Sequence, residues 1–233
     1  MIRIMFIVIA LALAGCSSGG NTVFERMAPM VQQQLFGEFG LDSGAADDGA
    51  TRPQVKTRAD LDRIPFATIS LKHGDNPTAF IVPLADNGGY LAYQDSVNRG
   101  ITMHGGLITA THGFGQDLDS VAHRDDDPIF APTPPQHWPA MLARSYGFNI
   151  RGESTFEITV QCTSRRANAE VIEIVERRFQ LLRMVETCVN AKRQFTNTYW
   201  VDAQSGFIWK SEQWVGPRIP TMTVEIVRPY RAN

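Results

Sequence analysis

Residues 195–217 read FTNTYWVDAQSGFIWKSEQWVGP, and no other stretch of the chain predicts its fold as strongly. Three of the four tryptophans lie here. Apolar and aromatic residues alternate in both halves of the stretch, which is the side-chain period of a β-strand. Between the halves, residues 202–206 read DAQSG, with an aspartate to begin a turn and a glycine that tolerates a positive φ. We therefore expect a β-hairpin.

The aromatic side chains of this hairpin have two possible roles. They usually form a buried core, because aromatic residues bury the most apolar area. The alternative is a platform on which a sugar ring or a partner protein packs. Four side chains are the candidates for such contact: Tyr199, Trp200, Trp209 and Trp214. We expect Tyr199 and Trp209 in the core, Trp200 on the opposite face from Tyr199, and Trp214 as the most exposed ring, since it lies beside the Gly216-Pro217 end of the second arm.

Short apolar runs separated by turn residues continue the strand pattern from Pro65 onward. We expect strands at 66–71, 78–82, 90–93, 101–103, 107–111, 145–150 and 155–161, with a last strand around Val224 and Ile226. Residues 119–139 are rich in aspartate and proline and are expected to form a long loop. Strands at this spacing predict a mostly β protein, with antiparallel sheets forming a sandwich or a half-open barrel.

Three segments bear on the helical content. Residues 22–36 have helix-like apolar spacing that Pro29 interrupts, and residues 57–61 fit a single helical turn. A short N-terminal helix is therefore expected after the tether. Residues 169–190 fit either one helix face or strands with a bulge, and periodicity does not choose between them.

The N-terminus has the features of a lipoprotein export signal. Arg3 precedes an apolar run at 4–14, and Leu13-Ala14-Gly15-Cys16 forms a lipobox, in which the cysteine thiol receives a diacylglycerol before cleavage. Acylation, palmitate included, would anchor the mature chain at Cys16. Ser17 replaces the aspartate that typically retains lipoproteins in the inner membrane, so we expect the periplasmic face of the outer membrane.

These features predict the domain organisation. Residues 1–15 are expected to be the signal peptide, 16–56 the lipidated N-terminus with its tether and short helical segment, and 57–233 a single β domain. Beyond the signal, no apolar run reaches transmembrane length. The chain has 22 basic and 24 acidic side chains and no basic run, which argues against a nucleic-acid partner.

The chain has three cysteines. If Cys16 carries lipid, Cys162 and Cys188 remain, and an even pair in the oxidising periplasm is usually a disulfide. Two separate buried thiols are the alternative, because sequence does not fix the distance between them.

Candidate catalytic and metal-binding residues are few. A metal site could be drawn from His104, His112, Asp117, Asp119 and His123, but their spacing matches no ligand motif, and no metal is expected. We find no phosphate loop and no nucleophile elbow, so no cofactor and no catalytic residue is predicted. A glycosidase needs two carboxylates at a set distance in space, and the sequence does not select a pair.

Together, the lipobox, the hairpin and the segment GGLITATHGFGQDL at 105–118 resemble the YjbF/GfcB lipoproteins of Gram-negative bacteria, which are associated with group 4 capsule and exopolysaccharide. The resemblance implies a mostly antiparallel β fold, and therefore strands at 169–190. It also implies a neighbouring outer-membrane barrel-type protein of an exopolysaccharide system as a partner, and brings no catalytic residues. Its glycine-rich motif has Gly113, Gly115, Asp117 and Leu118 at a tight turn.

Two functions are compatible with these features. The first is a non-enzymatic accessory lipoprotein of exopolysaccharide or capsule secretion, which binds an export protein or the polysaccharide. The second is a periplasmic hydrolase that modifies the polysaccharide. The lack of a local catalytic motif favours the first.

Overall fold

The computed structural model describes residues 57–231, except 96, 151–155 and 220. The predictions for the signal peptide, for Cys16 and for the helix-like segment at 22–36 fall outside the described residues.

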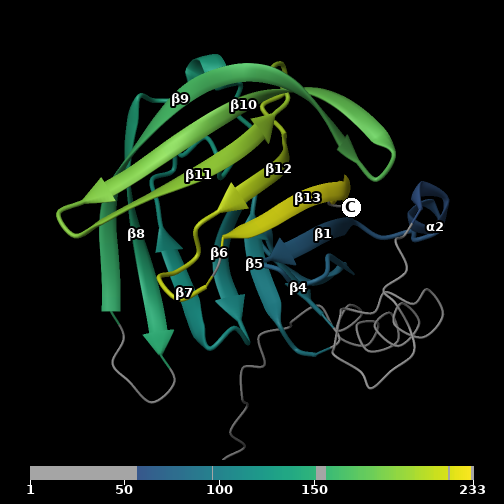
Figure 1. Cartoon of the computed structure of the whole chain (residues 1–233), viewed down its shortest axis with the longest axis horizontal. Coiled ribbons are helices and arrows are strands. Elements are labelled where there is room, and N and C mark those ends of the chain that lie inside the picture. The colour runs from purple at the N-terminus through teal and green to yellow at the C-terminus, as the bar shows by residue number, and fades with distance from the viewer. Residues whose placement is uncertain (1–56, 96, 151–155, 220, 232–233) are drawn as a thin grey trace, which may run out of the picture.

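The described residues form two antiparallel sheets, as the strand pattern predicts (Figure 1). The large sheet has nine strands in the order β2 (Ala79–Ile81), β1 (Thr68–His73), β13 (Met222–Arg228), β12 (Ile208–Gln213), β11 (Arg193–Val201), β10 (Arg177–Asn190), β9 (Phe156–Ile174), β8 (Met141–Ile150) and β7 (Gln116–Ala122). The small sheet has the order β3 (Pro83–Asn87), β4 (Tyr90–Gln94), β5 (Gly100–His104) and β6 (Leu107–His112). The expected half-open barrel is confirmed, because the large sheet curls over the small one.

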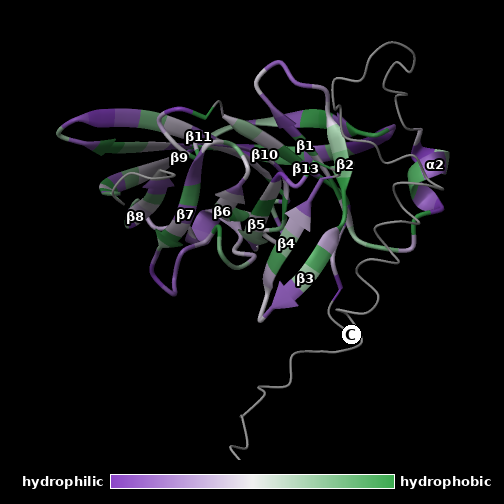
Figure 2. Ribbon diagram, turned by 90° about the horizontal axis from the view of Figure 1, so that it is seen from below, coloured by the Kyte–Doolittle hydropathy of each residue, from purple (hydrophilic) through white to green (hydrophobic). Residues whose placement is uncertain are grey.

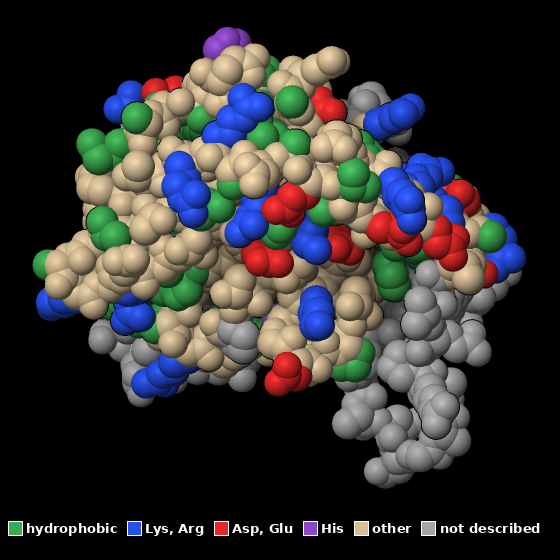
Figure 3. Space-filling model, turned by 45° about the horizontal axis from the view of Figure 1, so that its top comes forward, with side chains coloured by type: hydrophobic (Ala, Val, Ile, Leu, Met, Phe, Trp, Pro, Cys, Tyr) green, Lys and Arg blue, Asp and Glu red, His purple; other side chains and the backbone are tan. Residues whose placement is uncertain are grey.

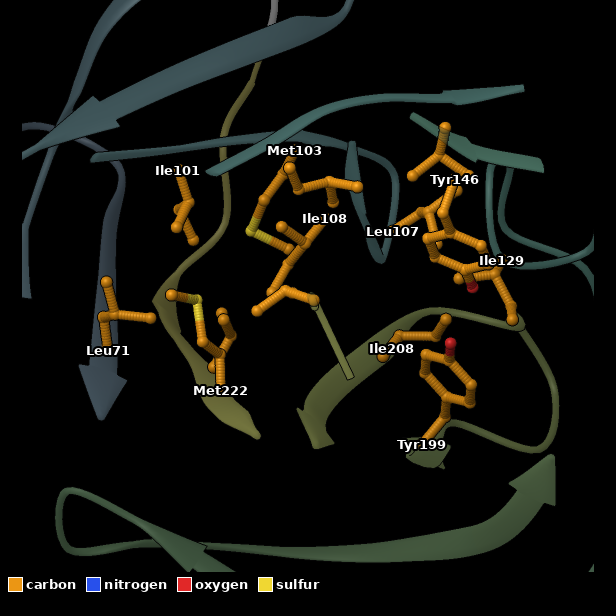
Figure 4. Close-up of a cluster of buried hydrophobic side chains, with 14 of the residues drawn as sticks. Leu71, Ile101, Met103, Leu107, Ile108, Ile129, Tyr146, Tyr199, Ile208 and Met222 are labelled. Atoms are coloured by element: carbon orange, nitrogen blue, oxygen red, sulfur yellow. The ribbon is translucent and has the colours of Figure 1, made fainter. Parts of the chain in front are cut away.

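The main hydrophobic core fills the space between the two sheets. Strand alternation supplies it: Ile101 and Met103 point inward from β5, while Tyr199 and Val201 point inward from β11. Figure 4 shows the side chains of Ile101, Met103 and Tyr199 pointing into this space, where Leu107 and Ile208 also lie. Figure 2 views the molecule from the side of the small sheet, where hydrophobic and hydrophilic residues alternate along the strands.

Residues 169–190 are strands, as the family resemblance implies, and not a helix. They belong to β9 and β10, whose hairpin turns at Val175 and Glu176, both with positive φ (43° and 63°). The pairing shifts register between Leu182 and Met184, which is a bulge of the kind that the pattern allowed. Glutamate and arginine side chains on both faces of this hairpin obscured its period of two.

The tip of the β9–β10 hairpin projects beyond the end of β11 and covers the part of the outer face that carries Trp209 of β12 and Val227 of β13 (Figure 1). There it meets α2 (Arg58–Asp62) in a second apolar cluster made of Leu61, Ile64, Val82, Ile174 and Val227. The helix begins with a capping box between Thr57 and Asp60. Its first backbone N–H group, that of Arg58, donates a hydrogen bond to Glu176 Oε2 at the tip of the hairpin (3.1 Å). The predicted helical turn at 57–61 is therefore confirmed.

Two strands were missed by the sequence analysis. β3 begins at a proline and forms an edge, and β7 occupies residues that were expected to be turn and loop. The long loop therefore begins after Ala122, not at Asp119. β7 shows little alternation because its pairing with β8 shifts between Leu118 and Ser120. Among the described residues, no helix is long and apolar enough to cross a membrane.

Candidate functional site

The aromatic hairpin is present as predicted, with β11 and β12 as its arms. Trp200 pairs with Lys210 across the hairpin. In the loop between the arms, the Asp202 carboxylate accepts hydrogen bonds from Ser205 N (2.7 Å), the Ser205 hydroxyl (2.7 Å) and Gln204 N (3.1 Å), and these bonds lower the pKa of Asp202. Gly206 has a φ of +74° and lies against the backbone of Thr133, where a Cβ would clash. The hairpin loop is therefore fitted to the long loop that precedes β8.

The rings of Tyr199 and Trp200 point to opposite faces of the large sheet, as alternation requires. Tyr199 is fully buried in the main core, so its ring is not available to a ligand outside the protein. Trp200 lies on the outer face and is 8% exposed, with its indole N–H donating to Glu170 (2.9 Å) and Lys210 Nζ lying 5.2 Å from its ring. Neither ring offers an open stacking surface.

Trp209 and Trp214 are both half-buried, on opposite sides of the sheet. Trp209 packs in the second apolar cluster beside Phe179, with ring centres 4.3 Å apart. Trp214 stacks on Phe195 at 4.0 Å and meets the edges of other core rings. Trp209 is thus in the outer cluster, not the main core. Trp214, which we expected to be the exposed ring, is half-buried, as Trp209 is, whereas Tyr199 and Trp200 are buried. The chain after β12 places the Trp214 ring against Tyr146 and Phe148 of β8.

The most unusual feature of the interior is a buried ionic network. Arg144 of β8 donates from Nε and Nη2 to Asp127 (2.6 and 2.9 Å), and from Nη1 to both oxygens of Glu186 of β10 (2.7 and 2.6 Å). Asn197 also donates to Glu186 (2.9 Å), and Tyr199 does so at 3.5 Å. The three charged residues are each at most 2% exposed. Burial of this kind is costly unless charges are paired and hydrogen-bonded, and here they are.

The network sets the protonation of its neighbours. Burial opposes the charged form of Arg144, but the Glu186 and Asp127 carboxylates outweigh it and raise the Arg144 pKa well above its ordinary value. Burial raises the pKa of Tyr146 to about 12, and burial together with Glu186 raises that of Tyr199 well above 10. The Tyr146 hydroxyl has no hydrogen-bond partner among the described residues. At neutral pH Arg144 is therefore charged, and the phenols of Tyr146 and Tyr199 are neutral.

Sequence reasoning missed this network, although a signal was present. Arg144 stands between Leu142 and Tyr146, and Glu186 between Met184 and Cys188, at positions where alternation demands an inward apolar residue. A charge at an inward position predicts a buried partner. Which partner it takes depends on strand order, because β9 lies between β8 and β10.

The network fastens the loop of residues 123–140 to the end of the half-barrel. The ring of Phe130 in this loop stacks on His104 (ring centres 3.5 Å apart) and packs at a tilt against His123 (3.7 Å). Gly106 N donates to Ile129 O (2.8 Å), and Gln213 reaches across to Gly106 O (2.8 Å). A pocket of about 70 Å³ remains beneath the loop, lined mainly by apolar residues that include Gly105, Pro128, Pro132, Gly206, Phe207 and Ile208.

Of the three histidines considered as metal ligands, His112 is exposed, and His104 and His123 have other contacts. His104 Nδ1 hydrogen-bonds Phe130 O (3.1 Å) and His123 Nδ1 bonds Arg124 O (2.8 Å), so each of these nitrogens carries the proton, because a carbonyl only accepts. Within the described part of the chain, three ligand-type side chains converge only at Cys162, Glu186 and Cys188. Both sulfurs there are in the Cys162–Cys188 disulfide, and Glu186 belongs to the ionic network.

The disulfide joins residues directly opposite each other in β9 and β10, and both are buried. Of the two readings of the cysteines, the bridge is the one found.

The glycine-rich motif carries the chain from β6 to β7, from the small sheet to the large one. Gly113 and Gly115 have positive φ values of 85° and 94°. The Asp117 carboxylate accepts from Gly113 N (3.0 Å), Phe114 N (3.0 Å) and the Thr111 hydroxyl (3.1 Å). That hydroxyl in turn accepts from the backbone of Leu118 (2.9 Å), which is itself fully buried. In this structure, the polar groups of the motif are engaged in forming the turn.

Comparison with known proteins agrees with the fold and the sequence motifs. The family model for the group 4 capsule polysaccharide lipoprotein GfcB, YjbF, matches residues 24–227. Among solved structures, the crystal structure of the hypothetical lipoprotein YmcC from Escherichia coli (K12) is similar, with a TM-score of 0.65 and 18% identity over 76% of this chain and 90% of that one. No curated protein sequence matches the chain. Because the family model covers most of its length, the chain belongs to the YjbF family of group 4 capsule polysaccharide lipoproteins.

Proposed function

We propose that this protein is a non-enzymatic accessory factor in the secretion of capsule or exopolysaccharide. It is anchored through Cys16 in the outer membrane, faces the periplasm, and binds an export protein or the polysaccharide. Family membership supports the association with capsule polysaccharide and with a lipid anchor. Ser17 after the lipobox supports the outer membrane.

The main support for a non-enzymatic role is that the buried charged residues pair with one another. A general acid or base must reach a proton on its substrate. Asp127, Arg144 and Glu186 have the burial typical of catalytic groups, but their side chains are at most 1% exposed and pair with each other. These charged groups hold the 123–140 loop in place and cannot reach a substrate, which supports a binding role for the protein over a hydrolytic one.

The protein could bind either an export protein or the polysaccharide, and experiments must distinguish these two ligands. An outer-membrane barrel-type protein of the same secretion system is the proposed protein partner. Both the loop of residues 123–140 and the outer faces of the two sheets are available to it. Copurification of the full-length lipidated protein with outer-membrane proteins after cross-linking in cells tests this partner.

The decisive experiment compares export with hydrolysis. Deletion of the gene is expected to reduce polysaccharide at the cell surface, and the wild-type chain to restore it. Cys16→Ser is expected to restore less and to leave the outer-membrane fraction. Normal recovery of this variant in the outer membrane would contradict the anchor.

Purified full-length protein in detergent should release no reducing ends from the native polysaccharide. New reducing ends that depend on the protein would favour the alternative, a polysaccharide-modifying hydrolase.

A further inference from the structure

The outer face of the large sheet carries an uncharged patch across β9, β10 and β11. Two rows of residues cross these strands in register: Thr163, Thr187 and Thr196, and beside them Gln161, Val189 and Gln194. We call these six residues the threonine face. Their sequence neighbours Cys162, Cys188 and Phe195 point into the core, so alternation turns the six side chains outward.

The side chains of the threonine face are open to solvent and free to bind. Five of the six are exposed, and Thr187 is half-buried. Within the part of the chain that the structure describes, none of the three threonine hydroxyls makes a hydrogen bond to another residue. This contrasts with Ser145 and Thr159 nearby, whose hydroxyls bond each other (2.7 Å). The row continues on β8 to Met141, which pairs with Thr163 and is 62% exposed.

Charge is absent from the threonine face and present around it. The next paired row along the strands begins at Arg165 and ends at Glu212. Figure 3 brings the outer face of the large sheet forward: acidic side chains gather with basic ones near its middle and toward α2, further basic side chains are spread over the face, and much of the remaining surface is tan, the colour of the other side chains and the backbone.

We infer that the threonine face is a docking surface for an uncharged stretch of polysaccharide, laid across the strands. Hydroxyls and amides both donate and accept hydrogen bonds, as sugar hydroxyls do. Neighbouring strands lie about 4.8 Å apart, close to the length of one sugar residue, so the three hydroxyls repeat at the interval of an extended glycan chain. Val189, which is 40% exposed, and Met141 offer apolar surface to the C–H groups of the rings.

Other occupants fit this surface less well. A polyanionic glycan would require arginine or lysine in the rows. A protein partner would be expected to bury aromatic or arginine anchors, and the six residues include neither. The inference rests on the proposed function and deepens it by naming the ligand class and the surface. It also places the glycan away from the hairpin tryptophans, whose rings are packed.

Affinity electrophoresis of the full-length protein in detergent provides the test. The probes in the gel are dextran and hydroxyethyl cellulose, which are neutral, alginate, which is anionic, and the native polysaccharide. At least one neutral probe is expected to retard the wild-type protein. In the triple variant Thr163→Val/Thr187→Val/Thr196→Val, the apparent affinity should fall at least tenfold. Valine keeps the shape and strand preference of threonine without its hydroxyl.

The matched control is Thr102→Val/Thr223→Val, which removes two strand hydroxyls from outside the threonine face and should bind as the wild type does. Equal melting temperatures establish that all variants fold. Equal retardation of the triple variant and the wild type would overturn the inference, as would retardation by alginate alone or by no probe. If the triple variant also restores polysaccharide export fully in the deletion strain, the threonine face is excluded while the accessory function stands.

Discussion

Arg144 and Glu186 form an ion pair with no exposed side-chain surface, joining β8 to β10 across the intervening β9. With Asp127, the pair becomes a triad of one cation and two carboxylates. A buried triad is not by itself a source of stability, because desolvation offsets the attraction between the charges. The triad instead fixes the position of a loop. Asp127 is its only member in a loop, and Arg144 can pair with Asp127 only when that loop is in one position.

Asp127→Ala should therefore release the loop of residues 123–140. Breaking a buried pair from one side costs about 3–5 kcal/mol, since the remaining charges lose a partner. The expected results are a lower urea midpoint and rapid proteolytic cleavage within the loop. Asp126→Ala is the matched control, because Asp126 pairs with Arg124 in an exposed position, and it should behave as the wild type. Equal protease resistance in both variants would contradict the fastening role.

Stability should fall steeply at alkaline pH. Burial raises the pKa of Tyr146 to about 12 and that of Tyr199 well above 10, whereas an unfolded tyrosine titrates near 10. Above pH 10 the unfolded chain binds fewer protons than the folded one, so stability present below pH 10 is lost as pH rises. Each tyrosine contributes a slope of about 1.4 kcal/mol per pH unit in this window. Urea unfolding at pH 9, 10 and 11 measures it.

Tyr146→Phe separates burial from hydrogen bonding. Within the described part of the chain the Tyr146 hydroxyl makes no hydrogen bond, so its removal should leave stability at pH 7 unchanged or raised, and should reduce the alkaline slope. A loss of more than about 1 kcal/mol at pH 7 would show that the hydroxyl has an unseen partner.

The disulfide predicts zero free thiols at Cys162 and Cys188 in the denatured, unreduced protein. The two residues are separated by 26 positions in sequence, and on the chain-entropy model such a bridge stabilises by roughly 3–4 kcal/mol. Cys162→Ser/Cys188→Ser should lose about that amount in urea unfolding. Titration of two thiols from these positions in unreduced wild-type protein would rule the bridge out.

Trp214→Ala should cost about 3–5 kcal/mol, because the ring fills space against Phe195, Tyr146 and Phe148. Trp214→Phe, which keeps most of the packing, should cost less than half as much. Melting temperatures of both variants give the comparison. If the alanine variant lost less than about 0.5 kcal/mol, the ring would behave as a surface residue. That result would favour the role of Trp214 as a platform for a sugar ring or a partner protein.

Asp117→Ala should destabilise the β6–β7 corner by about 1–3 kcal/mol, because two backbone N–H groups and the Thr111 hydroxyl lose their acceptor. Asp117→Asn keeps one acceptor oxygen and should lose less. Asp119→Ala is a control two residues away on an exposed position. A fully stable Asp117→Ala variant that fails to support polysaccharide export would instead assign the motif a direct functional role.

The sequence predicted those parts of the fold where one local pattern dominates. The 195–217 hairpin was legible because its apolar alternation and its turn residues agree. β7 was not, because a register shift interrupts its alternation, and β3 was not, because it is a short edge strand that begins at a proline. At 169–190 the hairpin tip packs apolar residues against α2 on one face but has charged side chains on both faces. Neither the strand period of two nor the helix period of 3.6 was therefore clear in the sequence.

The candidate sites were harder to predict because they depend on pairing across strands. Arg144 and Glu186 are 42 residues apart, and only the strand order brings them together. The threonine face has the same origin: three threonines separated in sequence become one row only when β9, β10 and β11 are in register. The burial of Tyr199 followed from alternation, whereas that of Trp214 depended on how the chain folds back after β12.

The second apolar cluster has a mechanical consequence. The chain enters the β domain at Thr57, and α2 is held to the tip of the β9–β10 hairpin by Leu61, Ile64 and the contact between Arg58 N and Glu176. Tension applied to the lipid anchor would therefore load this small cluster first. Because this cluster is much smaller than the main core, it should separate first, which would lengthen the reach of the domain from the membrane while the half-barrel and its disulfide stay intact.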